Sequence, residues 1–477
     1  MVKTPARAPR PAAVVVGGGI SGLIAARELA VAGFTVTVLE ASDAFGGCVA
    51  AHDVAGLRLD AGAESFATRS TAVVELVEEL GLGGDVVYPA GSGAWLQAAS
   101  GARPLPQTGI LGIPGDPLAD DVRAVIGHAA ALRAAADLAR PVSRSLTAGD
   151  MSLGELVRHR MGHTVLDELV TPVVSGVHSA DPDTLDVDAV APGLRAAVVE
   201  HGSLARAVSA MRAAAPAGSA VGGIAGGMHR LTTALVEELA DRGADLRLGT
   251  RVRRIGRNDD GYTLSIGEPD EAVAADRVVV ATDGPAAVDL LSQLDPALAA
   301  YRPQPGAGVS LVTLVLDRPE LDGDGPGGGP RGSGVLVSGE ADGIVAKALT
   351  HATSKWAWLA DEAGPGTHVL RLSYGRLSEA KARVADADDE TLYATALADA
   401  AALLGVDVAE QDVLGWDVVR YTGALPYATT GHKQRVTDFR AALAAFSSLD
   451  AVGGWLSGTG LAAVVADTRA RTRISVS

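Results

Sequence analysis

One stretch near the start of the chain constrains the fold more than any other. Residues 14–42, VVVGGGISGLIAARELAVAGFTVTVLEAS, pass from an apolar run through clustered glycines into a second, alternating apolar run. Gly17, Gly19 and Gly22 form the pattern G-x-G-x-x-G. In a β-α-β unit the first glycine permits a tight turn, the second lets the backbone approach a pyrophosphate, and the third lets helix and strand pack closely. The stretch therefore predicts strand, helix and strand, with an anion site at the helix N-terminus.

An acidic residue follows the second predicted strand. Glu40 lies 18 residues after Gly22, close to the roughly 20 residues at which the acid of this motif binds a ribose hydroxyl. A carboxylate there favours an unphosphorylated ribose, and hence FAD or NAD rather than NADP. The fingerprint predicts these cofactor-binding residues: Gly17, Gly18, Gly19, Ile20, Ser21, Gly22, Glu40 and Ala41.

Two further segments favour FAD over NAD. Gly46 and Gly47 form a glycine pair soon after the second strand, as in FAD oxidoreductases of the glutathione-reductase type. Residues 452–473, VGGWLSGTGLAAVVADTRARTR, resemble the closing segment of those proteins, in which a glycine turn passes the flavin and a helix follows. NAD dehydrogenases need no such closing segment, so the sequence predicts FAD.

Charge and cysteine content restrict the remaining classes. The 477 residues carry a formal net charge of −17, so phosphate backbones would repel the chain and nucleic-acid binding is not expected. The single cysteine, Cys48, fits a reducing cytoplasm. The basic start runs directly into the first strand and is interpreted as a lead rather than a signal peptide. No uncharged apolar run of about 20 residues occurs, so at most peripheral membrane contact is expected.

The distribution of predicted elements indicates an α/β protein with a discontinuous Rossmann-like FAD-binding domain. That domain comprises residues 1–70, 222–285 and 446–477. A mixed α+β substrate-binding domain comprises residues 71–109 and 286–445, and a mostly helical insertion comprises residues 110–221. Within the insertion, Ser152 three residues before Glu155 is the signature of a helix N-cap. The oligomeric state, monomer or homodimer, stays open.

Motifs along most of the chain resemble the protoporphyrinogen/coproporphyrinogen oxidase family of FAD enzymes, within the amine-oxidase-like flavoproteins. LDAGAESFATRS resembles the family's second flavin-contact loop, and LVTPVVSGVHSADPDTLDV resembles its P-x-x-x-G-V turn and following D-P segment. GGMHRLTTAL, TSKW and LPYATTGH complete the set. The resemblance implies the glutathione-reductase/amine-oxidase type of fold and noncovalent FAD, since covalent attachment in amine oxidases uses a cysteine of the C-terminal flavin turn. It places these further residues at the cofactor: Gly46, Gly47, Cys48, Gly62, Ala63, Glu64, Ser65, Val252, Ala281, Thr282, Tyr421, Thr459, Gly460 and Leu461.

The resemblance also implies a reaction. A porphyrinogen would be oxidised to a porphyrin in three two-electron steps of haem biosynthesis, with O2 as acceptor and H2O2 as product. The acidic chain without a spanning helix most resembles the soluble coproporphyrinogen III branch of monoderm bacteria. The expected partners are the porphyrinogen, O2 and the next haem-pathway enzyme. A protoporphyrinogen IX oxidase, a flavin amine oxidase, a carotenoid-desaturase-like enzyme and a flavin-free binding protein stay as alternatives.

Substrate and catalytic residues follow less directly. The backbone carbonyl of Gly176, in the predicted G-V turn, is implied to contact the pyrroles, and His178 is the titratable side chain nearby that would relay protons. A simple turn glycine and a structural histidine are the alternatives. The family's propionate-binding arginine corresponds to Ala94, so Arg69 and Arg103 become the candidates, each with a surface arginine as its alternative.

A metal site is not predicted. His159 and His163 have i, i+4 spacing on an expected helix, but a third ligand is not evident.

Overall fold

The core of the nucleotide-binding part is a five-stranded parallel sheet. The computed structural model describes residues 10–90, 93–98, 101–107, 109–142, 146, 149–178, 180–214, 221–267, 271–304, 306–323, 331–339, 341, 343–375, 384–425, 429–458 and 460–473, without the side chains of 177, 178, 307, 424 and 425. The strand order is β12 (Asp245–Arg247), β2 (Thr35–Leu39), β1 (Ala12–Val16), β16 (Arg277–Val280) and β22 (Leu449–Ala451). The sheet thus combines strands from three distant segments, which confirms the predicted α/β fold.

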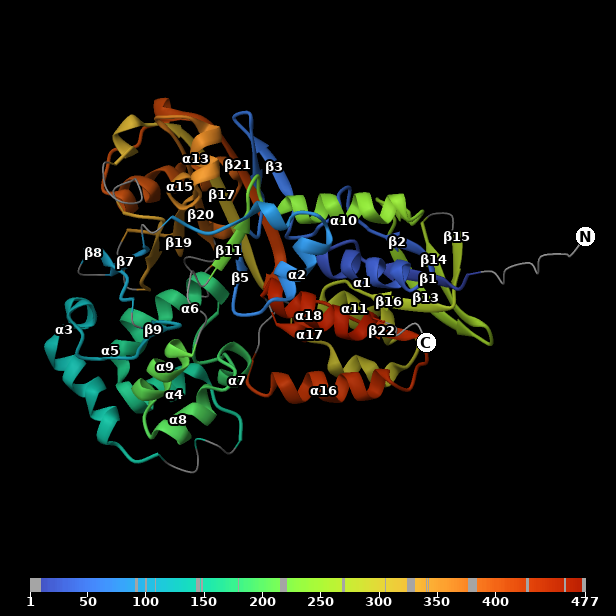
Figure 1. Cartoon of the computed structure of the whole chain (residues 1–477), viewed down its shortest axis with the longest axis horizontal. Coiled ribbons are helices and arrows are strands. Elements are labelled where there is room, and N and C mark those ends of the chain that lie inside the picture. Colours follow the sequence, from blue (N-terminus) through green and yellow to red (C-terminus); the bar gives the residue numbers. More distant parts are fainter. Residues whose placement is uncertain are drawn as a thin grey trace, which may run out of the picture.

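Both faces of this sheet are covered, as its apolar central strands require. Val15 packs with α1 (Ile20–Val31), α10 (His229–Asp241) and α18 (Leu461–Thr472). Val14 and Val16 face the opposite layer. That layer contains the antiparallel sheet β13 (Val252–Asn258), β14 (Gly261–Ile266) and β15 (Glu271–Ala275), with α11 (Gly284–Leu291), α16 (His432–Leu443) and α17 (Gly454–Ser457) (Figure 1).

A seven-stranded mixed sheet forms the second part. Its order is β21 (Val413–Leu425), β17 (Ala307–Asp317), β20 (Thr367–Tyr374), β19 (Ala348–His351), β18 (Gly334–Val337), β7 (Trp95–Ala98) and β8 (Gly101–Pro104). One face packs on α15 (Asp389–Leu404). The other packs on α12 (Ala352–Lys355), α13 (Ala357–Ala363) and the hairpin of β3 (Ala51–Val54) and β4 (Leu57–Asp60). The hairpin therefore connects the two parts.

Smaller elements lie between the two sheets. β11 (Val221–Ile224) pairs with β5 (Phe66–Ala67) and β6 (Val86–Val87). α2 (Ala72–Glu79), which the sequence-based division places in the substrate domain, packs in the same core as α1 and α18. The division into domains itself stays a prediction.

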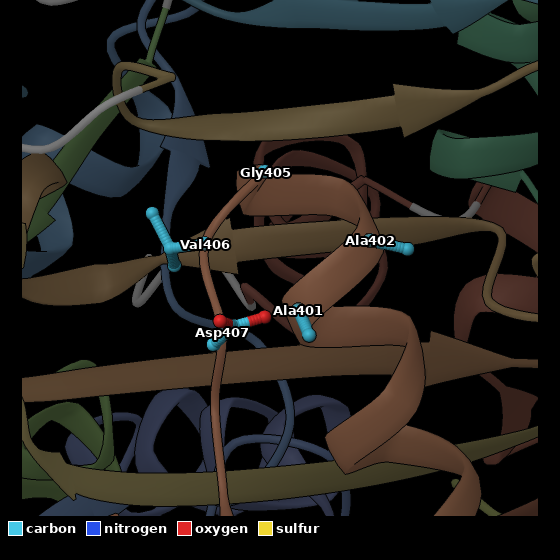
Figure 2. Close-up of a pocket in the computed structure, with 5 residues that line it drawn as sticks. All are labelled: Ala401, Ala402, Gly405, Val406 and Asp407. Carbon is cyan, nitrogen blue, oxygen red and sulfur yellow. The ribbon is translucent and has the colours of Figure 1, made fainter.

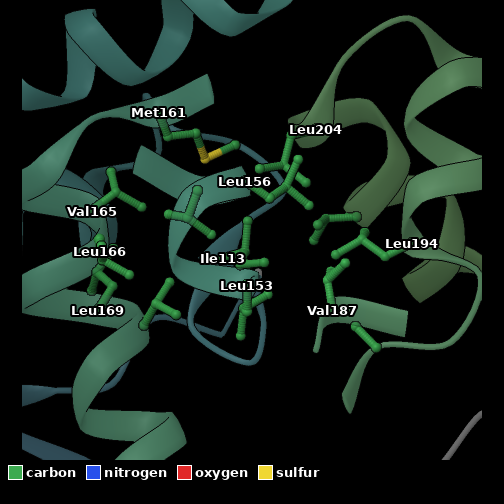
Figure 3. Close-up of a cluster of buried hydrophobic side chains, with 14 of the residues drawn as sticks. Ile113, Leu153, Leu156, Met161, Val165, Leu166, Leu169, Val187, Leu194 and Leu204 are labelled. Carbon is green, nitrogen blue, oxygen red and sulfur yellow. The ribbon is translucent and has the colours of Figure 1, made fainter. Parts of the chain in front are cut away.

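The third part is a helical subdomain with its own core. Its elements are β9 (Gly109–Ile110), β10 (Ile113–Pro114), α3 (Asp120–Ala135), η2 (Ala136–Ala139), α4 (Leu153–Met161), α5 (His163–Val165), η4 (Leu166–Val170), α6 (Thr171–His178), α7 (Val187–Val190), α8 (Leu194–His201) and α9 (Leu204–Ala213). Figure 3 shows the buried leucines and valines that these helices share. The Ser152 hydroxyl accepts a hydrogen bond from Glu155 N at 3.0 Å, which confirms the predicted helix N-cap.

Two local predictions in this subdomain are wrong. Gly162, at φ 98°, ends α4, so His159 and His163 do not share one helix. The segment around Gly176 is the helix α6 rather than a turn. Across the described ranges, no helix combines the length and apolar character needed to cross a bilayer.

Candidate functional site

The glycine loop between β1 and α1 has the geometry of a phosphate cradle. Gly17 has φ +103°, and a Cβ there would lie 2.8 Å from the Ala281 carbonyl oxygen. A Cβ on Gly22 would lie 1.9 Å from the Gly17 oxygen, so neither position accepts a side chain. Gly19 differs, because no protein atom lies within 4 Å of the place its Cβ would take. The loop is thus tightly packed at Gly17 and Gly22 and open at Gly19.

The helix that follows presents its N-terminus to this open side. The first hydrogen bond of α1 runs from Leu23 N to the Gly19 oxygen at 3.0 Å. The N–H groups of Ile20, Ser21 and Gly22 therefore precede the helical ladder and carry the positive end of the helix dipole. These backbone N–H donors lie beside the open surface at Gly19. Such an arrangement fits a pyrophosphate.

A cavity of about 300 Å³ lies beside the same loop. Glu40 lines it and holds the loop: its Oε2 accepts from Gly18 N at 2.6 Å, and its Oε1 accepts from Ser42 N and Oγ, each at 2.8 Å. Five predicted cofactor residues line this cavity: Gly17, Glu40, Ala41, Val252 and Thr282. Carboxylate and cradle share one recess, which fits the ribose and adenine of a dinucleotide.

A chain of backbone contacts extends from the cradle toward the seven-stranded sheet. Gly46 N donates to the Gly18 oxygen at 2.8 Å, and Ala63 N donates to the Cys48 oxygen at the same distance. A Cβ on Gly62 would lie 2.3 Å from the Cys48 oxygen and 2.9 Å from the Tyr421 hydroxyl. The glycine pair, the loop after β4 and β21 are thereby brought together, and their contact with the flavin stays a prediction.

Three charged side chains lie at the end of this path. Glu64 pairs with Lys355 through one carboxylate oxygen and with Arg371 Nη2 through the other, at 3.0 Å. Burial by itself would raise the pKa of the Glu64 carboxyl, but the Arg371 and Lys355 cations outweigh it and lower that pKa to about 2. Glu64 is therefore ionised at neutral pH. Sequence reasoning missed both cations, although Lys355 lies in the quoted TSKW motif.

A second acid fixes the start of α10. Asp60 Oδ2 accepts from Met228 N at 2.9 Å, and Asp60 Oδ1 accepts from His229 N at 2.9 Å. The same Oδ1 lies 3.0 Å from His229 Nδ1. Asp60 thus satisfies helix N–H groups that no side chain of α10 caps. This pairing was also missed, because its members lie 169 residues apart.

The two weak acids of the region stay protonated at neutral pH. Burial raises the pKa of Tyr421 to about 12. The Cys48 side chain is solvent-accessible, yet the surrounding protein raises the pKa of its thiol above the usual value. Neither group is therefore an anionic nucleophile at neutral pH.

The other predicted residues are placed as follows. Gly460 is the N-cap of α18 and Leu461 its first residue, while Thr459 and the side chain of His178 lie outside the described residues. Gly176 lies in α6, where the helix packs on β18 and a Cβ would come within 2.7 Å of Leu336 Cδ2, the end of a flexible side chain. Ser65 is half-buried, and Arg69 and Arg103 are exposed. Their roles stay predictions.

A second hollow, of about 580 Å³, lies elsewhere (Figure 2). Ala401, Ala402, Gly405, Val406 and Asp407 line it at the C-terminal end of α15. Asp407 is the one ionisable side chain in this lining, and the cradle residues are not part of it. The cavity beside Glu40 is therefore the better candidate for a cofactor.

Comparison with known proteins agrees with this geometry. The chain is 32% identical over 458 residues to the coproporphyrinogen III oxidase of Mycobacterium leprae, covering 94% of this chain and 95% of the relative. It is 27% identical over 463 residues to that of Bacillus subtilis, covering 94% of each. A solved structure from Exiguobacterium sp. 255-15, named provisionally as a protoporphyrinogen oxidase, superposes with a TM-score of 0.82 at 27% identity, covering 97% of this chain and 98% of that one.

A family model agrees in turn. The model for flavin-containing amine oxidoreductases matches residues 20–446, from the start of α1 to the segment before β22. This range includes nearly all of the chain apart from the two terminal segments. The chain therefore belongs to the flavin-containing amine oxidoreductase family.

Proposed function

We propose that this protein oxidises coproporphyrinogen III to coproporphyrin III with noncovalently bound FAD. The observation that carries the proposal is the similarity, over nearly the whole chain, to coproporphyrinogen III oxidases. Six electrons and six protons leave the porphyrinogen in three steps, and three O2 are reduced to three H2O2. The single cysteine supports a cytoplasmic location.

The chain's own residues would hold the cofactor in two places. Gly19 and the N-terminus of α1 would bind the pyrophosphate, and Glu40 would accept hydrogen bonds from the ribose hydroxyls. Bound FAD supplies the two-electron oxidation chemistry that amino-acid side chains lack. The segment from Gly62 to Ser65, anchored on Cys48, would line the flavin part of the site.

Two groups are the candidates for contact with the porphyrinogen. Gly176 lies in the last turn of α6, where backbone carbonyls have no partner within the helix, so its oxygen would accept from pyrrole N–H groups. Arg69 and Arg103 are exposed cations that would bind propionates. His178 is the candidate for carrying protons away.

Parallel turnover of two porphyrinogens tests the proposal. Coproporphyrinogen III has four propionates and protoporphyrinogen IX has two, so one additional charge-assisted contact in the transition state is expected to raise kcat/KM about tenfold or more for the former. Porphyrin fluorescence measures both rates, and added salt should weaken the preference. Equal or faster oxidation of protoporphyrinogen IX at low salt would assign the chain to the protoporphyrinogen reaction instead.

We expect the flavin to be released completely when the protein is denatured. Cys48 is the only cysteine of the chain, and residues 452–473 contain none. Acid or heat precipitation followed by absorbance of the supernatant measures the released flavin, and phosphodiesterase treatment distinguishes FAD from FMN. Flavin that stays with the precipitate after washing would contradict noncovalent binding.

A further inference from the structure

The charged cluster around Glu64 is buried and contains two cations and one anion. The side chains of Glu64, Lys355 and Arg371 are only 14%, 16% and 14% exposed. One carboxylate is shared by two cations, and Lys355 Nζ also lies 5.1 Å from the centre of the Trp356 ring. The Asp60 carboxylate lies nearby but accepts from the first N–H groups of α10, and the positive end of that helix dipole offsets part of its charge. The three side chains together carry one excess positive charge.

The same cations hold the segment after β4 by its backbone. Arg371 Nη1 donates to the Gly62 oxygen at 2.6 Å and to the Asp60 oxygen at 3.4 Å. Ala63 N in turn donates to Cys48, whose segment contacts the glycine cradle through Gly46. An unbroken set of contacts thus joins the cluster to the cofactor cradle.

Both cations lie on elements of the seven-stranded sheet or packed against it, and their positions relative to residues 60–64 are therefore fixed. Arg371 lies on β20, a central strand of the seven-stranded sheet, and Lys355 ends α12, which packs on the same sheet face. Glu64, by contrast, lies in an irregular segment between β4 and β5. The sheet therefore provides a rigid support. The Glu64 carboxylate, paired with both cations, fixes the charged ends of the Lys355 and Arg371 side chains in place.

We propose that Lys355 and Arg371 are positioning residues that hold residues 60–64 at the flavin and, through their one excess positive charge, stabilise the negative charge of the reduced flavin. This inference rests on the flavin site of the proposed function. A buried positive charge lowers the free energy of a nearby anion more than an exposed one does, because little water screens it. The reduction potential of the bound flavin then depends on the net charge of the cluster.

The experiment measures the midpoint potential of the bound flavin in the purified holoenzyme by dye-linked reductive titration. Lys355→Met removes one positive charge and is expected to disfavour the reduced form about tenfold, a decrease of about 30 mV for a two-electron couple. Glu64→Gln removes the negative charge at nearly constant shape and is expected to raise the potential by a similar amount. The double variant should return close to the unmodified protein.

The control is Lys433→Met, which removes a charge of the same sign from an exposed position on α16 and should leave the potential unchanged. Opposite shifts in the two single variants support the proposal, since a merely structural role would not reverse sign with charge. Shifts of the same sign, or none, would overturn it. If Lys355→Met fails to fold, the expected upward shift of Glu64→Gln alone decides.

The titration uses no porphyrinogen, so it is independent of the proposed reaction. Opposite shifts in a protein that fails to oxidise coproporphyrinogen III would support the charge role and contradict the reaction. Unchanged potentials in variants of an active oxidase would contradict the charge role alone.

Discussion

Replacing Gly19 with valine is expected to give a folded but colourless protein. The backbone at Gly19, with φ −68° and ψ 174°, is extended and accessible to valine. No protein atom lies within 4 Å of its Cβ position, so the fold itself has room. The added methyl groups would instead occupy the space in front of the helix N-terminus, where the pyrophosphate is proposed to bind. We expect FAD affinity to fall about 100-fold or more, which is about 2.7 kcal/mol.

Visible flavin absorbance and FAD titration of the apoprotein measure this effect, and circular dichroism checks the fold. Gly84→Val is the matched control, because its Cβ also meets no atom within 4 Å but lies in the short helix η1 (Gly83–Asp85), away from the cradle. Gly22→Ala provides the contrast: its Cβ would lie 1.9 Å from the Gly17 oxygen, so it should destabilise the fold. A Gly19→Val protein that stays fully yellow would refute the proposed position of the pyrophosphate.

Replacing Arg160 with methionine is expected to reduce the free energy of unfolding by about 3–5 kcal/mol. Arg160 and Asp137 form an ion pair in the helical subdomain in which both side chains are 0% exposed. The guanidinium also donates to the carbonyl oxygens of Asp137, Arg140 and Pro141, each at 3.0 Å. Methionine removes the cation. The buried Asp137 carboxylate then keeps the hydrogen bond from Ala205 N but loses its ion pair.

Urea unfolding followed by circular dichroism measures the loss. Arg158→Met is the control on the same helix, because Arg158 pairs with Asp183 at the surface and should contribute about 1 kcal/mol or less. Adding Asp137→Asn to Arg160→Met should recover part of the loss, since no unpaired charge then stays buried. Equal effects of Arg158→Met and Arg160→Met would show that burial does not govern the contribution of this pair.

The nucleotide-binding unit could be predicted because its information is local. Within one strand-turn-helix, Gly17 adopts a positive φ, Gly22 approaches the Gly17 oxygen too closely for a Cβ, and Gly19 leaves the turn open; Glu40 follows the very next strand. The alternation of Val14 and Val15 between two layers follows from the two-residue period of a strand. Such features depend on steric limits that act over a few residues, so the sequence alone was sufficient to place them.

The segment around Gly176 shows where local signals mislead. Proline and glycine within five residues favour a turn, yet Pro172 is the second residue of α6 and directly follows the π-helical turn η4, in which the usual helical hydrogen-bond ladder is already interrupted. Gly176 lies where α6 packs on β18, and a Cβ there would meet the Leu336 side chain at 2.7 Å. The helix packs on a strand 160 residues later in the chain, and a local sequence pattern carries no signal of such a long-range contact.

What the sequence by itself determined is the cofactor class, the family and the positions of the glycines and the acid that form the cradle. Only the tertiary structure decided which charges meet in the site. Glu64 pairs with Lys355 across 291 residues of sequence, and Arg371 reaches the same carboxylate from β20. The pairing of β19 with β20 and the packing of the β3–β4 hairpin on that sheet set these distances. Charged side chains are common along the chain, and the fold buries these three at one point, where little water screens their charges.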